Sequence, residues 1–321
     1  MLKRLLAIWG AGVLLIISLF SALATAATAP AGQGLEISPP LVEKNAPPGQ
    51  KLSFPIRVRN VTKAAVVTHA QVNDFVANGE EGQAKVLTSG EPSPYSFIAW
   101  VEPIPDLSLA AGEAKTTTVT IDTPTNASPG GHYGVIRFTG TPQNGGGTSV
   151  SLTASVGTLV LLDVPGKQTI SASLIDFYTT KNGQKASAFE YGPVGFVERI
   201  QNSGNVHIQP IGTVRVTNTF GRQVAVLSVN PNGGNILPAS IRRFEQVLPN
   251  KHLFGYYKAE ANITYNGQTM NKNLSFWVIP YKMILIVLGA IIIVVALVRA
   301  NTKRAVKKAT RGSGDSSKSK K

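Results

Sequence analysis

The sequence predicts an all-β fold: two tandem immunoglobulin-like β-sandwich domains, with an N-terminal signal peptide and one C-terminal transmembrane helix. Residues 35–279 contain many short β-branched runs separated by Gly, Pro and Asn, without a sustained helical period. These runs form two series whose elements follow the same order. Two long uncharged apolar segments flank them, one near each end of the chain.

The first apolar segment has the organisation of a secretory signal peptide. Lys3 and Arg4 precede the run LLAIWGAGVLLIISLFSALA, and the small residues ending at Ala26 fit the Ala-x-Ala pattern that signal peptidase accepts. Residues 1–26 are therefore assigned to a signal peptide, with an uncleaved N-terminal anchor as the alternative. Either assignment predicts that the following chain is exported.

Residues 35–165 are expected to form the first sandwich. The turn signals are Asn78-Gly79 and the glycines at 145–147. The expected strands lie within residues 52–62, 65–77, 114–124, 133–142 and 149–164.

Residues 166–279 are expected to form the second sandwich, with turns at residues 182–183 and 266–267. Short strands at near-regular spacing are typical of an immunoglobulin-like domain. The expected strands lie within residues 169–180, 196–204, 211–221, 223–229, 242–248, 256–265 and 273–280.

Each series contains a Gly-x-Tyr tripeptide before its penultimate strand, with Gly131 and Tyr133 in the first and Gly255 and Tyr257 in the second. A tyrosine at this place in a sandwich can hydrogen-bond backward to the corner backbone. The motif therefore predicts a tyrosine corner in both domains. The alternative is that both tyrosines are ordinary strand aromatics.

The second apolar segment predicts a transmembrane helix over residues 281–299, because residues 283–298 are uncharged and Lys282 and Arg299 bracket them. Residues 299–321 then hold nine Lys or Arg against one Asp. Cationic segments are retained in the cytoplasm, so residues 300–321 are expected to form a basic cytoplasmic tail. This predicts a single-pass protein of the cell membrane with its N-terminal ectodomain outside.

The formal net charge of +14 arises mainly from these topogenic ends. The tail contributes +8 and the signal peptide +2, which leaves +4 for the sandwiches, so nucleic acid is not an expected partner. The chain has no cysteine, which excludes a disulfide framework and favours a bacterial surface over a eukaryotic ectodomain.

Motifs for catalysis are missing from the sequence. The four histidines are isolated, and no nucleophile elbow, phosphate-binding loop or metal-ligand spacing occurs, so we expect no catalytic residue, metal site or cofactor. Glu80 and Glu81 suggest either a cation site or a solvated hairpin tip, and the tip is favoured. Ligand-binding residues are not identified, and the best candidate loops are residues 89–94 and 230–238.

The chain resembles bacterial surface proteins that interact with WxL-domain proteins. The resemblance runs through ISPPLVEKNAPPGQKLSFPIRVRN, through SPYSFIAWVEPIPDLSLAAGEAKTTTVTIDTPTNASPGGHYGVIRF, and through the single span with its basic end. It implies a peptidoglycan-binding first module and, by order of elements alone, a host-binding second module. The matching motifs are turns and core positions, so no ligand residue is carried over. Trp100 fits the family pattern and is expected to be a buried sheet aromatic.

Three functional classes remain. The first is a non-catalytic, membrane-anchored surface protein for binding, adhesion or scaffolding, which engages peptidoglycan, another wall polymer or surface proteins. The second is a membrane-tethered assembly factor that acts by β-strand addition, for which an unpaired apolar sheet edge would be evidence. The third is an enzyme with its site on the sandwich loops, which is the least favoured class.

Overall fold

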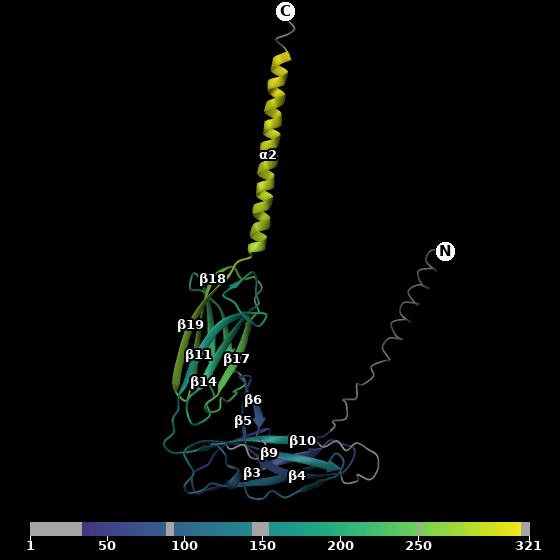
Figure 1. Ribbon diagram of the computed structural model, residues 1–321, viewed down its shortest axis with the longest axis vertical. Coiled ribbons are helices and arrows are strands. Elements are labelled where there is room, and N and C mark those ends of the chain that lie inside the picture. Colours follow the sequence, from purple (N-terminus) through teal and green to yellow (C-terminus); the bar gives the residue numbers. More distant parts are fainter. Residues whose placement is uncertain (1–33, 88–92, 143–153, 250–251, 316–321) are drawn as a thin grey trace, which may run out of the picture.

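The computed structural model describes residues 34–87, 93–142, 154–249 and 252–315 (Figure 1). It confirms the prediction of an all-β fold of immunoglobulin-like sandwiches followed by one C-terminal apolar helix. The signal peptide, the glycine turn at residues 145–147 and residues 316–321 of the basic tail lie outside the described residues.

The first sandwich packs a three-stranded sheet against a five-stranded sheet. Inward-facing residues such as Ile56, Ile121 and Phe138 are fully buried between them. The first sheet has the order β1 (Leu35–Ser38), β3 (Lys51–Asn60), β8 (Ala114–Asp122). The second has the order β2 (Leu41–Asn45), β10 (Ala154–Val164), β9 (Gly130–Pro142), β4 (Val66–Asn73), β7 (Leu107–Leu109).

The second sandwich packs a four-stranded sheet against a five-stranded sheet around a core that includes Phe196, Ile200 and Phe276. The four-stranded sheet has the order β12 (Gln184–Lys185), β11 (Ala172–Lys181), β14 (Val194–Asn202), β17 (Ile241–Leu248). The five-stranded sheet has the order β13 (Ala188–Phe189), β19 (Gln268–Val278), β18 (Gly255–Tyr265), β15 (Ile211–Asn218), β16 (Gln223–Val229).

The single strand expected within residues 65–77 is two strands in the structure. β4 ends at Asn73, and β5 (Phe75–Asn78) leaves the sheet to pair with β6 (Gln83–Val86) as a separate hairpin. The carbonyl of Asp74 accepts a hydrogen bond from the amide of Leu87 at 2.8 Å, which closes the base of this hairpin. The hairpin projects from the first sandwich toward the second (Figure 1).

The prediction that Trp100 is a buried sheet aromatic is wrong. Trp100 ends the short 3-10 helix η2 (Ile98–Trp100) and is half-buried, with its ring centroid 4.5 Å from that of His132. Pro103 and Pro105 follow closely, and they lack the amide donors that a strand in the sheet would need.

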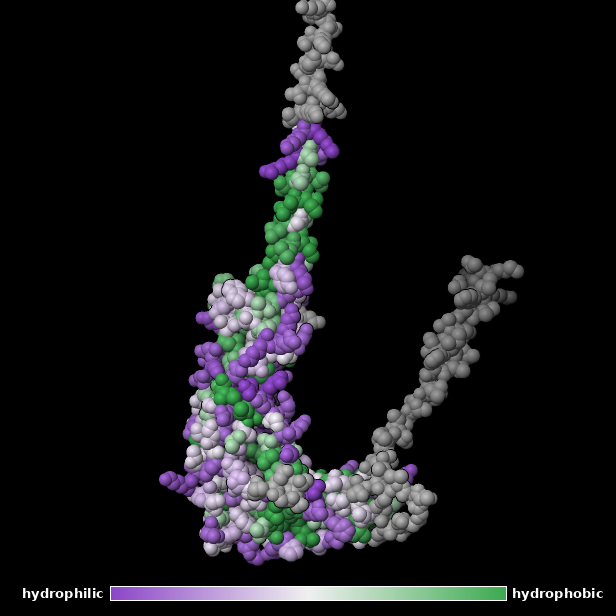
Figure 2. Space-filling view, in the orientation of Figure 1, coloured by the Kyte–Doolittle hydropathy of each residue, from purple (hydrophilic) through white to green (hydrophobic). Residues whose placement is uncertain are grey.

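Two residues, Ile279 and Pro280, separate the end of β19 from helix α2 (Tyr281–Asp315). Among the described residues, α2 is the helix that is long and apolar enough to cross a membrane. The segment that could span it is Tyr281–Arg304. Its surface is hydrophobic along most of this length (Figure 2). Lys282 pairs with Glu190 of the second sandwich at 2.9 Å, so the first turn of α2 is attached to the domain. The side of the membrane on which the sandwiches lie stays a prediction.

The two sandwiches are joined in an L shape (Figure 1). The second sandwich carries α2 at one end and meets the first sandwich at the other end. Between β10 and β11 the chain has seven residues, 165–171. Where the two sandwiches meet, they bring together residues that are far apart in the sequence.

Candidate binding site between the two sandwiches

The tip of the β5–β6 hairpin is held by arginines of the second sandwich. Arg199 Nε donates to Oε2 of Glu80 at 2.7 Å, and its Nη2 donates to the other carboxylate oxygen. The amide of Arg243 donates to the Glu80 carbonyl at 2.8 Å, and its guanidinium lies 3.4 Å from the carboxylate of Glu81. The hydrogen bond from Arg199 lowers the pKa of Glu80, so the bidentate pair is charged at neutral pH.

This contact corrects the interpretation of Glu80 but not that of Glu81. The carboxylate of Glu80 is held by Arg199 of β14, whereas Glu81 is 61% exposed on the same tip, as the solvated-tip prediction expects, and pairs with Arg243 of β17. Asn78-Gly79 does form the predicted turn, but the turn docks on a second domain. A partner more than 100 residues away in the sequence could not be inferred from the local turn signal.

The second contact between the domains involves Asn205, which binds the first sandwich and the linker. Its carbonyl accepts the amide of Gly131 at 2.8 Å, and its Nδ2 donates to the carbonyl of Pro129 at 3.0 Å. Its Oδ1 accepts the amide of Thr169 at 2.8 Å. Asn205 thus holds the start of β9 next to the linker between the domains.

Tyr133 extends this contact and departs from its predicted role. Its hydroxyl lies 3.3 Å from Nδ1 of His207, in the second sandwich, rather than on the corner backbone of its own domain. Burial lowers the pKa of His207 and raises that of Tyr133. The imidazole is therefore neutral, and its Nδ1 shares a hydrogen bond with the phenol hydroxyl. The tyrosine-corner prediction is wrong for Tyr133, since its hydroxyl bonds across the domain boundary.

Tyr257, in contrast, bonds to its own corner. Its hydroxyl donates to the carbonyl of Phe254 at 3.2 Å and accepts the amide of the same residue at 3.0 Å. Gly255 lies between them with φ +104°, a conformation that favours glycine. The second Gly-x-Tyr motif therefore has the geometry that a tyrosine corner requires.

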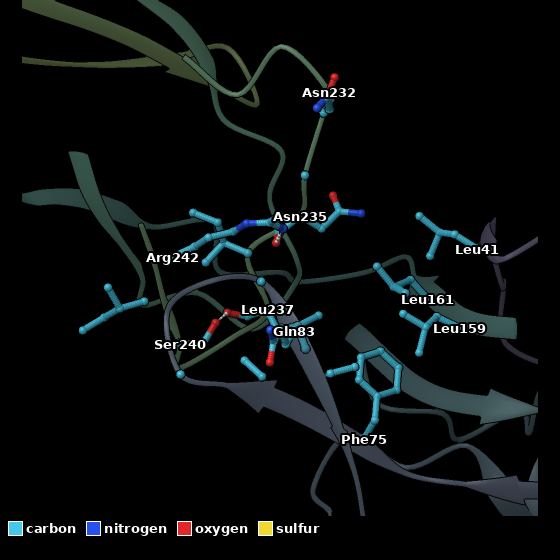
Figure 3. A pocket seen from close by; sticks show the side chains of 18 residues that line it. Leu41, Phe75, Gln83, Leu159, Leu161, Asn232, Asn235, Leu237, Ser240 and Arg242 are labelled. Atoms are coloured by element: carbon cyan, nitrogen blue, oxygen red, sulfur yellow. Dashed lines mark hydrogen bonds between the residues drawn. The ribbon is translucent and has the colours of Figure 1, made fainter. Parts of the chain in front are cut away.

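An apolar cavity of about 260 Å³ lies between these contacts (Figure 3). The first sandwich contributes Leu41, Phe75, Leu159 and Leu161, which project from β2, β5 and β10, and the second contributes Leu237. Polar groups border the cavity on the second sandwich: Asn232, Asn235, Ser240 and Arg242.

The loop at residues 230–238, which the sequence names as a candidate, supplies the wall of the cavity on the second sandwich. Residues 232–237 line it, and Asn235 Nδ2 donates to the carboxylate of Glu43 on β2. Arg242 Nη1 donates to the carbonyl of Asn235 at 2.7 Å, which fixes the loop. The other candidate loop, residues 89–94, lies mostly outside the described residues.

Strand β2 forms the edge of the five-stranded sheet beside this cavity. It pairs with β10 in parallel, and the amide of Leu159 donates to the carbonyl of Pro40 at 2.9 Å. At the other end of the pair the amide of Ala46 donates to the carbonyl of Asp163 at 2.8 Å. These two bonds set the alternation of backbone groups along the whole strand.

This alternation directs the amides and carbonyls of Leu41, Glu43 and Asn45 away from β10. Within the described part of the chain, no backbone group pairs with them. The edge is therefore an unpaired row of donors and acceptors next to an apolar cavity. Such an arrangement can accept a further extended strand.

The lining favours binding over catalysis. Leucine and glycine are its most frequent residues, and Arg242 is its charged member. Among the described residues no group of three His, Cys, Asp or Glu could hold a metal ion. The site offers shape, apolar contact and backbone hydrogen bonds, which are the means of recognising a polypeptide.

An apolar run in the sequence of β10 indicates this site, although the strand predictions do not use it. Leu159, Val160, Leu161 and Leu162 are consecutive apolar residues in β10. In a sandwich with one wet face, alternate positions would be polar. The continuous run indicates that both faces of β10 are covered, and the outward residues Leu159 and Leu161 line the cavity.

Comparisons with known proteins bear on the fold. No protein-family model matches the chain, and no curated protein matches it by sequence. Similar solved structures include the class 5 fimbriae chaperone CfaA, which is 17% identical over 77% of this chain and 100% of that chain, with a TM-score of 0.37. The E. coli chaperone DraB is 15% identical over 76% of this chain and 96% of that chain, with a TM-score of 0.34.

A third similar structure comes from the complex of the Salmonella enterica SafA pilin with the SafB chaperone. It is 11% identical over 77% of this chain and 99% of that chain, with a TM-score of 0.35. At these identities the likeness concerns the fold alone.

Proposed function

We propose that this protein is a non-catalytic, membrane-anchored binding protein that holds an extended segment of a partner protein between its two sandwiches. The segment adds as a strand to the open edge of β2, and one of its apolar side chains fills the adjacent cavity. The sequence offers β-strand addition as its second functional class, and the geometry of the cleft favours this mode of binding.

The observation that carries the proposal is the unpaired edge of β2 beside an apolar cavity. Backbone bonds to Leu41, Glu43 and Asn45 would provide affinity without dependence on sequence. The cavity would select an apolar side chain at one position, because Leu, Ile, Ala and Phe side chains form most of its side-chain lining. The contacts at Glu80 and Asn205 would hold the walls in place before the partner arrives, which reduces the entropy cost of binding.

Membrane anchoring through α2 fits a role at the cell surface. The span would hold the second sandwich beside the bilayer and the first sandwich farther out, so a partner emerging from or attached to the surface would meet the cleft between them. Binding to peptidoglycan or another wall polymer, as the WxL-interacting resemblance implies, stays a prediction of the sequence.

A photocrosslinking experiment in intact cells tests the proposal. Benzoylphenylalanine is placed at Leu41, beside the cavity, or at Ile211, an exposed apolar position at the start of β15. We expect a protein adduct from position 41 and none from position 211, with the crosslink mapping to one extended apolar segment. Equal labelling at both positions, or an adduct with glycan alone, contradicts the proposal.

A backbone variant separates strand addition from side-chain contact. Asn45→Pro removes an outward amide on the open edge, whereas the bond from Ala46 to Asp163 remains. Asn45→Ala keeps the amide and serves as the matched control. Loss of the adduct in the proline variant alone is the expected result, and equal adduct in both variants argues against strand addition.

A further inference from the structure

The end of the second sandwich nearest α2 exposes large aromatic side chains on separate segments. Phe220 is 92% exposed and Phe254 is 69% exposed, on the β15–β16 and β17–β18 loops. Tyr191, Trp277 and Tyr281 are also exposed. We call these five residues the aromatic collar. Side chains of this size are seldom left in water on several neighbouring loops of one domain.

Strand register places the collar at the level where the chain enters α2. Gly255 pairs with Val278, so Phe254 lies opposite the end of β19. The hydroxyl of Thr219 donates to the carbonyl of Tyr256 at 3.0 Å, which brings the Phe220 turn to the same end. The loop that carries Tyr191 is attached to α2 by the ion pair of Glu190 with Lys282.

The turn that carries Phe220 is fixed by its own hydrogen bonds. Asn218 Oδ1 accepts the amides of Phe220 at 3.1 Å and Arg222 at 3.0 Å. The carbonyl of Asn218 also accepts the amide of Gly221 at 2.9 Å. Phe220 therefore points away from the domain core on a closed turn.

Phe254 is held by the tyrosine corner. Both its amide and its carbonyl bond to the hydroxyl of Tyr257, which is itself buried. This leaves the phenyl ring on the outside of the corner. Phe220 and Phe254 are thus held by two separate sets of hydrogen bonds, and both lie at the same end of the domain.

The apolar part of α2 is short for a bilayer. Residues 283–298 carry no charge, and sixteen residues of helix extend about 24 Å, whereas the hydrocarbon core is about 30 Å thick. A short span draws the interface toward the residues that flank it. The aromatic collar flanks this span directly.

We propose that the aromatic collar lies in the interfacial layer of the same bilayer that α2 crosses, and so fixes the orientation of the sandwiches on the membrane. Aromatic side chains favour this layer, where an apolar ring contacts the lipid chains. The proposal rests on α2 spanning a membrane but does not depend on what the cleft binds.

The test uses the full chain, which has no cysteine, reconstituted into liposomes of phosphatidylcholine and phosphatidylglycerol. A single cysteine at position 220, 254 or 211 carries an environment-sensitive NBD dye. Ile211 is the matched control, because it is exposed and apolar but lies at the opposite end of β15. We expect blue-shifted emission at 220 and 254, with quenching by nitroxide lipids labelled near the headgroup, and neither effect at 211.

Water-like emission at both 220 and 254 in inserted protein would overturn the proposal. Blue-shifted emission without quenching by lipid nitroxides would also overturn it, because a second copy or another protein would then cover the collar.

A flexible Gly/Ser linker inserted after Ile279 provides the second measurement. Retained quenching at 220 and 254 is expected, since the collar has its own affinity for the interface. Loss of quenching would show that the tether alone holds the loops near the lipid, and would contradict the proposal. Protein that fails to insert would contradict the membrane span on which the proposal rests, and would overturn the proposal with it.

Discussion

Gly131 and Gly255 occupy the same place in two Gly-x-Tyr motifs for different physical reasons. A Cβ at Gly131 would lie 1.7 Å from the hydroxyl oxygen of Tyr133, so only glycine leaves room for that ring. Gly255 has open space around it but adopts a φ of +104°. One motif therefore serves an interdomain contact in the first copy and a tyrosine corner in the second.

Replacing either tyrosine with phenylalanine removes its hydroxyl alone. Tyr257→Phe should lower the free energy of unfolding by about 1–2 kcal/mol, because the corner loses its bonds to Phe254. Tyr133→Phe should have a similar effect, because the buried Nδ1 of His207 loses its hydrogen-bond partner. Urea unfolding of residues 35–279 measures both, and an unchanged midpoint in both variants would refute these assignments.

The burial of Glu198 makes the stability of the second sandwich depend on pH. It is fully buried in β14, and within the described residues neither carboxylate oxygen has a hydrogen-bond partner. Burial raises its pKa to about 8, so the side chain is a neutral acid in the folded state at pH 7. The unfolded chain ionises near pH 4.5, and stability is therefore lost as the pH rises from there toward 8.

Glu198→Gln should remove this pH dependence while keeping the shape of the side chain. Between pH 5 and pH 7.5 the stability of the variant relative to the parent protein should rise by about 3 kcal/mol. Urea unfolding at both pH values gives the difference. A difference that stays constant between the two pH values would mean that Glu198 is ionised in the folded domain.

At the scale of elements, the β5–β6 hairpin determines how the sandwiches are joined. It leaves the first sandwich at Asp74 and places Glu80 on Arg199 and Arg243 of the second. A hairpin stabilised only by its own pairing would be marginal in water. The hairpin therefore depends on its contacts with the second sandwich for its stability.

Glu80→Ala should loosen the joint, because it removes both charge-assisted bonds to Arg199. Spin labels on cysteines at positions 116 and 228, one in each sandwich, should show a broader distance distribution. Glu81→Ala is the control, since Glu81 is 61% exposed and lies 3.4 Å from Arg243. Equal broadening in the two variants would mean that Glu80 has no special part in the joint.

Several elements were predictable because their signals are local. The run at 242–248 corresponds to β17 (Ile241–Leu248), and that at 52–62 to β3 (Lys51–Asn60). The break at Asp74 was not predictable, since the apolar pattern continues through it. Trp100 lies outside the sheet because of the prolines that follow it, whereas its aromatic side chain alone favours a strand.

The site was predictable only in part. The loop at 230–238 was identified by its length and composition, and it does line the cavity. The pairs Glu80–Arg199 and Tyr133–His207 join residues from different domains. Single-sequence patterns describe one element at a time, so they contain no information about such pairs.

At the scale of the whole molecule, the cavity exists only where both sandwiches meet. Leu41 and Leu159 lie on one wall and Leu237 on the other. Two residues, Ile279 and Pro280, separate the second sandwich from α2, so the domain joins the apolar helix without a stalk. The cleft is therefore formed by one domain that adjoins α2 and one that lies farther from it (Figure 1).

The predicted topology can be checked on intact cells. Protease added outside should digest the sandwiches and leave a membrane stub that carries the basic tail, because cationic segments are retained in the cytoplasm. An antibody against a tag at the C-terminus detects the stub. Loss of the tag on the same treatment would show that the tail is outside.

The measurement that tests the central claim most directly is amide hydrogen exchange of β2 by NMR, in the fragment of residues 35–279 with and without the segment that photocrosslinking identifies. The amides of Val42 and Lys44 face β10 and should be protected in both states, whereas those of Leu41, Glu43 and Asn45 should become protected only on binding. Unchanged exchange at these three amides in a saturated complex would contradict strand addition in the cleft.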